Sequence, residues 1–130
     1  MELGIGAGVV IAVLVAATRP WLVVPFTTDP AVRDLTEQVL WFVALVQPVA
    51  AAVFVLDGIL IGAGDTRYLA LAMLLASAAY AVLLAVAFAT DAGLLWLWAA
   101  FSCWVGFRWI GLYARYRTDR WIVTGTVRTP

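Results

Sequence analysis

Residues 35–61 read LTEQVLWFVALVQPVAAAVFVLDGILI, and after Gln38 this stretch holds one charged residue, Asp57. A helix needs roughly 20 predominantly apolar residues to cross a hydrocarbon core of about 30 Å. The stretch lacks the period-two alternation of barrel strands, and an open strand would leave backbone groups unsatisfied in lipid. It therefore predicts a transmembrane helix.

Three further apolar runs surround this one, at about residues 3–26, 68–90 and 93–113. Each is long enough to span a bilayer. The sequence therefore predicts an all-α membrane protein, with a four-helix transmembrane segment over residues 1–114 and a cytoplasmic arginine-rich tail over residues 115–130.

The composition supports lipid as the main partner. Hydrophobic residues make up 65% of the chain. Charged residues make up 12%, about half their share in a typical soluble domain.

The composition also argues against several function classes. The formal net charge of zero gives no basis for nucleic-acid binding. The chain has no histidine and one cysteine, Cys103, so neither a metal site nor a cofactor is expected. No nucleophile–base pair is recognisable, so we do not expect an enzyme.

The distribution of arginine predicts the orientation. The tail holds four arginines and the turn between the second and third helices holds one, whereas the other two loops mix charges or carry only Asp91. Arginine-rich loops stay on the cytoplasmic side. Both termini are therefore predicted to be cytoplasmic, in a multi-pass protein of the cell membrane. The arginines that decide this are Arg67, Arg115, Arg117, Arg120 and Arg128.

Asp57 is the strongest functional candidate. It lies about 10 Å from the centre of its predicted helix, still inside the hydrocarbon core. An ionised Asp at a helix centre costs roughly 2.5–3.5 kcal/mol. Its neighbours one turn away are apolar, so it must find a partner on another helix, water or backbone, or stay protonated. We predict that Asp57 binds a proton or cation during transport; the alternative is a structural Asp. Arg108 is expected to reach the inner interface, with an ion-pair role as its alternative.

Four other residues of this helix carry predictions. Gln47 and Pro48 lie in mid-helix, where proline removes a backbone donor, so we expect a hinge or a static bend, with Gln47 as a possible cavity residue. Gly58 and Gly62 form a small-xxx-small pair, which predicts close helix packing. Asp65 follows in the turn and is expected to cap the next helix.

The stretch from Pro25 to Leu69 resembles the multidrug and toxic compound extrusion (MATE) family, in particular the branch related to the DNA-damage-inducible protein F. The order and spacing of several pieces carry this resemblance. The matching pieces are Phe26-Thr27 with Asp29, Gln47-Pro48, Leu56-Asp57-Gly58 and the sequence GAGDTRY at residues 62–68.

The resemblance implies a fold of twelve helices in two six-helix lobes, of which this chain would supply helices nine to twelve. It also implies export of organic cations and drugs in exchange for protons or sodium ions. An acid in the tenth helix takes part in cation coupling in part of the family, and Asp57 matches that position. We expect a truncated fragment that is inactive without the missing N-terminal helices or an oligomeric partner.

Two other interpretations remain open. A complete four-helix multidrug exporter could act as a dimer, although exporters of that kind carry a membrane-embedded Glu in the first helix, and none is present in residues 3–26. A non-transporting scaffold or regulatory subunit is the other, and an Asp57→Asn substitution without consequence would favour it.

Overall fold

The computed structural model describes residues 2–122, so the end of the predicted tail, with Arg128, lies outside the described residues. This part of the chain is all-helical, and four of its helices are long and apolar enough to cross a membrane. The elements are α1 (Glu2–Val23), α2 (Pro30–Gly62), α3 (Thr66–Ala89), α4 (Gly93–Tyr116) and a short 3-10 helix, η1 (Asp119–Trp121).

Two helices are longer than the sequence suggested. The second begins at Pro30 instead of near residue 35, because Asp29 caps it by accepting a hydrogen bond of 2.9 Å from the backbone N–H of Ala31. Proline suits the first turn, where its missing N–H costs nothing. The fourth helix continues to Tyr116, which places Arg115 inside the helix and not in the tail.

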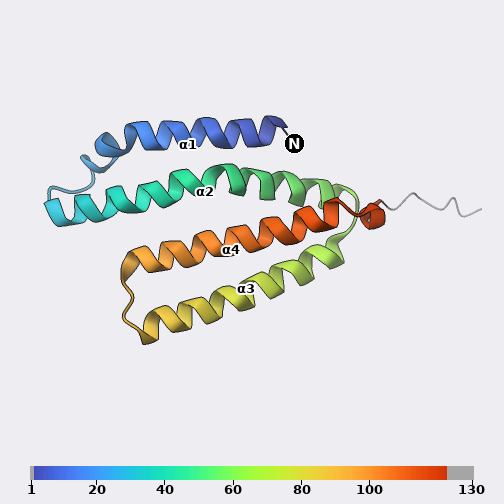
Figure 1. Ribbon diagram of the computed structural model, residues 1–130. Coiled ribbons are helices and arrows are strands. Elements are labelled where there is room, and N and C mark those ends of the chain that lie inside the picture. Colours follow the sequence, from blue (N-terminus) through green and yellow to red (C-terminus); the bar gives the residue numbers. More distant parts are fainter. Residues whose placement is uncertain (1, 123–130) are drawn as a thin grey trace, which may run out of the picture.

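The helices lie in the spatial order α1, α2, α4, α3, as Figure 1 shows. Among the described helices, α1 packs mainly on α2, while α4 packs against both α2 and α3. The start of α1, the turn between α2 and α3 and the end of α4 lie at the same end of the bundle. The last long helix, α4, therefore lies between α2 and α3, the two helices that precede it in the sequence.

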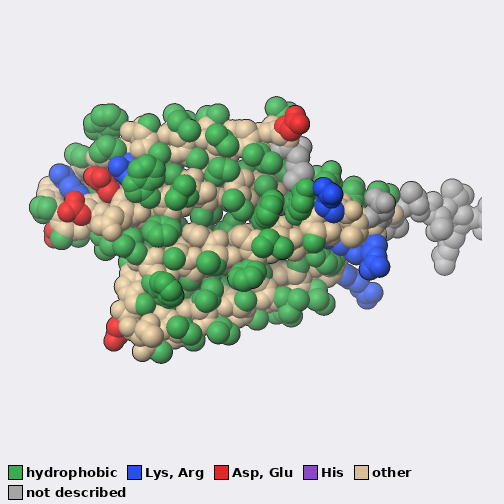
Figure 2. Space-filling view, viewed as in Figure 1, with side chains coloured by type: hydrophobic (Ala, Val, Ile, Leu, Met, Phe, Trp, Pro, Cys, Tyr) green, Lys and Arg blue, Asp and Glu red, His purple; other side chains and the backbone are tan. Residues whose placement is uncertain are grey.

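The buried core lies between α2 and α4. Its fully buried side chains are Leu56 and Leu60 of α2 and Leu112 of α4. Outside this seam most large apolar side chains are exposed, and Figure 2 shows hydrophobic side chains over the whole visible face. Lipid tails are as apolar as leucine, so close packing and polar contacts must hold these helices together.

Two glycines bring α1 against α2. A Cβ atom added to Gly8 would lie 2.6 Å from the Cβ of Ala51 and 3.0 Å from the Cα of Pro48. A Cβ on Gly4 would collide with the Cγ2 methyl group of Val55. Gly4 and Gly8 are therefore the small-xxx-small pair that packs two helices here, and the sequence analysis did not single them out.

The predicted packing pair, Gly58 and Gly62, has no such role within the described residues. A Cβ on either glycine would meet nothing within 4 Å, and both residues are exposed. The expected close approach is therefore absent between the described helices. Packing of this face against a helix outside residues 2–122 stays a prediction.

Pro48 lies inside an unbroken helix. Figure 1 shows α2 as one helix that changes direction near its middle, and Gly8 of α1 contacts the backbone at Gln47 and Pro48. Proline leaves the carbonyl group four residues earlier without its helical N–H partner, which permits such a bend. Whether Pro48 also acts as a hinge stays a prediction.

Replacing Gly8 with alanine should loosen the packing of α1 on α2. The new methyl group would meet the Ala51 side chain and the α2 backbone, and overpacking of this kind costs about 1–3 kcal/mol. Gly6→Ala is the matched control, because a Cβ there meets nothing within 4 Å. Unfolding followed by circular dichroism in mixed micelles should show a clear loss of stability for Gly8→Ala alone. Equal stability of the two variants would contradict this packing.

Candidate functional site

The structure supplies the partner that Asp57 lacks on its own helix. Arg108 of α4 donates a hydrogen bond of 2.7 Å from Nη2 to Oδ2 of Asp57. The side chains of Asp57 and Arg108 are only 18% and 13% exposed. The structure therefore contains the alternative given for Arg108, an ion pair between helices, while its expected reach to the inner interface stays a prediction. The reason is local: a paired charge in lipid costs less than two separate ones.

The ion pair is incomplete on the carboxylate side. The second oxygen of Asp57, Oδ1, is buried and accepts no hydrogen bond from the described residues. On the other side of the arginine, Cζ of Arg108 lies 5.3 Å from the ring centre of Trp104, within the range of a cation–π contact. The guanidinium group therefore has two electrostatic partners, one on each helix, and the carboxylate has one.

A second ion pair joins the turn after α2 to the end of α4. Nε of Arg115 donates a hydrogen bond of 2.7 Å to Oδ2 of Asp65. Close to it, the hydroxyl group of Tyr68 donates a bond of 2.7 Å to the carbonyl oxygen of Gly111. Gly64 adopts a left-handed backbone conformation with φ of 79°, which allows the tight turn. We call these contacts of Asp65, Tyr68, Gly111 and Arg115 the turn clamp.

The turn clamp explains the GAGDTRY sequence. Asp65 is the N-cap residue of α3, as predicted, but its side chain makes no capping hydrogen bond. The carboxylate turns to Arg115 because a charged donor gives a stronger bond than a backbone N–H group. Two residues of this sequence, Asp65 and Tyr68, thus hold α4 in place.

The remaining predicted site residues lie away from the carboxylate. Gln47 precedes Asp57 by ten residues, or about 15 Å along α2, and its side chain makes no hydrogen bond among the described residues. The structure therefore does not bring Gln47 and Pro48 together with Asp57. No group of three or more metal-ligating side chains occurs between residues 2 and 122.

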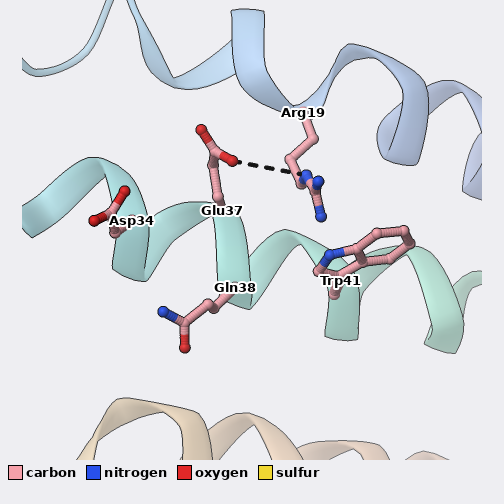
Figure 3. A pocket seen from close by; sticks show the side chains of 5 residues that line it. All are labelled: Arg19, Asp34, Glu37, Gln38 and Trp41. Carbon is pink, nitrogen blue, oxygen red and sulfur yellow. Dashed lines mark ion pairs between the residues drawn. The ribbon is translucent and has the colours of Figure 1, made fainter. Parts of the chain in front are cut away.

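A polar pocket that the sequence analysis did not predict lies where α1 approaches the first half of α2. It is lined by two acids, an amide, an aromatic ring and one arginine, and Figure 3 shows Arg19 reaching from α1 toward Glu37 and Trp41 of α2. The guanidinium Cζ lies 4.3 Å from the ring centre of Trp41, and Nε lies 3.9 Å from Oε2 of Glu37. An arginine inside the apolar run at residues 3–26 was the available signal. The pocket residues are Arg19, Asp34, Glu37, Gln38 and Trp41.

An aromatic cluster lies where α3 meets the first half of α4. Tyr80 of α3 packs against Phe101 and Trp104, with ring centres 6.5 Å and 6.0 Å away. An open cavity of about 220 Å³ is lined by Tyr80, Phe101, Trp98 and Leu97. Tyr80 therefore belongs to an aromatic surface between α3 and α4.

Four apolar helices long enough to span a bilayer, two of them joined by an ion pair, define a multi-pass membrane protein. The chain belongs to the MatE family, whose characteristic sequence matches residues 1–92. This match includes Asp57 and the whole of the turn after α2, and it ends before α4.

Three proteins of Arabidopsis thaliana are similar to this chain. Protein DETOXIFICATION 45, chloroplastic, is 26% identical over 93% of the chain and 22% of its own length. Protein DETOXIFICATION 43 is 34% identical over 72% of the chain and 18% of its own length, and Protein DETOXIFICATION 42 is 33% identical over 83% and 21%. The chain thus spans about a fifth of these relatives. No solved structure matches it.

Removing one hydroxyl group should weaken the turn clamp. Tyr68→Phe deletes the hydrogen bond to Gly111, and a bond of this kind contributes about 1 kcal/mol. Tyr113→Phe is the matched control, because that hydroxyl group only accepts a longer, exposed bond of 3.3 Å from Arg117. Unfolding in mixed micelles should show a larger loss of stability for Tyr68→Phe than for Tyr113→Phe. A loss no larger than that of Tyr113→Phe would argue against the clamp.

Proposed function

We propose that this chain is part of a secondary active antiporter that exports organic cations and drugs in exchange for protons or sodium ions. Asp57 is the coupling residue in this proposal. The observation that carries it is a carboxylate inside a membrane helix, with one oxygen on Arg108 and the other buried without a partner among residues 2–122. Ionisable residues within spans are expensive and mark ion pathways. Membership of the MatE family supports the transport class.

We further propose that the chain corresponds to helices nine to twelve of the twelve-helix fold, in the branch related to the DNA-damage-inducible protein F. Alternating access needs two bundles that move around a shared site. The described helices form a single row whose faces are mostly exposed, including the glycine face at Gly58 and Gly62. Helices supplied by the rest of the transporter, or by an oligomeric partner, would cover these faces.

The charge distribution supports a cytoplasmic position for both termini of the chain, because the start of α1 and the end of α4 lie at the same end of the bundle. Figure 2 shows arginine side chains gathered at the end where α4 finishes, whereas the opposite end mixes both signs. Arg67, in the first turn of α3, adds a further positive charge to this end. Because loops rich in arginine remain inside, we place this end in the cytoplasm and the protein in the cell membrane.

The aromatic cavity between α3 and α4 supports the proposed substrate class. Its lining of Tyr80, Trp98 and Phe101 offers ring faces, which attract flat organic cations through cation–π contacts. The volume of about 220 Å³ suits part of a drug-sized molecule and leaves the rest to surrounding helices.

A scaffold or regulatory subunit is the second candidate. The observation that favours it is the ion pair itself, because Arg108 neutralises Asp57 and joins α2 to α4 without any transport role. On this alternative, Asp57→Asn changes stability alone.

The chain by itself should not transport. Vesicles that contain only the 130-residue protein should show no dye efflux driven by a proton or sodium gradient, because a second bundle is lacking. If the DNA upstream of Met1 encodes eight more apolar spans, the restored protein should show such efflux, and its Asp57→Asn variant should lose most of it. Gradient-driven efflux by the chain alone would contradict the fragment proposal. Normal coupled efflux by the Asp57→Asn variant would contradict the role of Asp57.

A further inference from the structure

We infer that Arg108 is a tethered cation that occupies Asp57 until the coupling ion displaces it. This inference rests on the proposed function in one respect, because it takes Asp57 as the coupling carboxylate. It adds a residue on another helix, beyond the family match at residues 1–92, as the competitor that sets how readily the carboxylate takes up its ion.

The first argument is the geometry of the contact. Arginine can bind a carboxylate through two parallel hydrogen bonds, but the hydrogen bond found between Arg108 and Asp57 is a single one, from Nη2 to Oδ2. The other oxygen, Oδ1, is buried and has no donor among the described residues. Oδ1 is therefore the unused acceptor of the carboxylate, at which an incoming proton or sodium ion can bind while Arg108 still holds Oδ2. Once the carboxylate is neutralised, its attraction for the guanidinium group is lost.

The second argument is that the guanidinium group of Arg108 has an alternative position beside an aromatic ring. Its guanidinium group already lies near the face of Trp104, with Cζ 5.3 Å from the ring centre. The same side chain lines an open groove of about 260 Å³ between α3 and α4, together with Tyr68 and Phe107. After release from Asp57 the arginine can thus stay over an aromatic face, where a cation remains stabilised.

The third argument is that Asp57 has no alternative counter-ion among the described residues. Its only ion pair and its only side-chain hydrogen bond are with Arg108. Several titratable or charged groups are carried by α2 and by the helices that pack against it, but none of them is bonded to Asp57. These groups are Arg33, Asp34 and Glu37 on α2, Glu2 and Arg19 on α1, Arg67, Tyr68 and Tyr80 on α3, and Cys103, Tyr113, Arg115 and Tyr116 on α4.

Carbodiimide labelling tests this competition directly. Dicyclohexylcarbodiimide reacts with protonated carboxyl groups inside membranes, so its yield on Asp57 measures the contest between a proton and Arg108. The 130-residue protein in lipid vesicles would be labelled at neutral pH and analysed by peptide mass spectrometry. Arg108→Gln should raise the yield about tenfold, because a lone carboxylate in lipid takes up a proton. Arg108→Lys keeps the charge and should label close to the unmodified protein, and Asp57→Asn gives the background.

Arg115→Gln is the matched control. It removes another arginine of α4 from another carboxylate at the same hydrogen-bond distance of 2.7 Å, but leaves Asp57 and Arg108 in place. The labelling yield on Asp57 in the Arg115→Gln variant should equal that in the unmodified protein. The inference is overturned if Arg108→Gln labels Asp57 no more than the unmodified protein, or if Arg115→Gln raises the yield equally. The labelling result does not depend on transport, so a failure of the proposed function would appear separately, as normal efflux by an Asp57→Asn transporter.

Discussion

The rest of the structure depends on the cost of placing a charge in lipid. Asp57 of α2 and Arg108 of α4 each lie within an apolar span, and they meet at 2.7 Å. Neither charge is easily accommodated alone, so the pair fixes which face of α4 turns toward α2. The leucine seam of Leu56, Leu60 and Leu112 then packs around this orientation. A four-helix row with α4 between α2 and α3 follows from that contact.

Two further features fix the ends of the row. The turn clamp ties the end of α4 to the start of α3, through Arg115 with Asp65 and Tyr68 with Gly111. On the other side, α1 is held by the close approach of Gly8 to the bend at Pro48. Apolar burial contributes little between helices in lipid, so such contacts decide the arrangement. The same contacts leave the exposed faces free for further helices.

Much of the fold could be predicted from local patterns. The four apolar runs predicted the four long helices of the described residues, although the second was expected to begin near residue 35 and begins at Pro30. The residue pairs across helices could not be predicted, because nothing in a single sequence tells which span lies beside which. Arg108 was therefore expected to reach the membrane interface, and the side chain of Asp65 was expected to cap α3. Gly58 and Gly62 were singled out for helix packing instead of Gly4 and Gly8. Asp57 could be identified because the free-energy cost of a carboxylate in an apolar span is visible from the sequence of that span alone.

An exchange of charges between α2 and α4 tests the central claim most directly. Unfolding in mixed micelles would be measured for Asp57→Arg, Arg108→Asp and the variant that carries both changes. Each single change places two like charges together in lipid, so both should destabilise the protein strongly. The double variant restores an ion pair and should recover much of the loss. If it is as unstable as the worse single variant, Asp57 and Arg108 are not partners, and the account of the fold and of the site fails together.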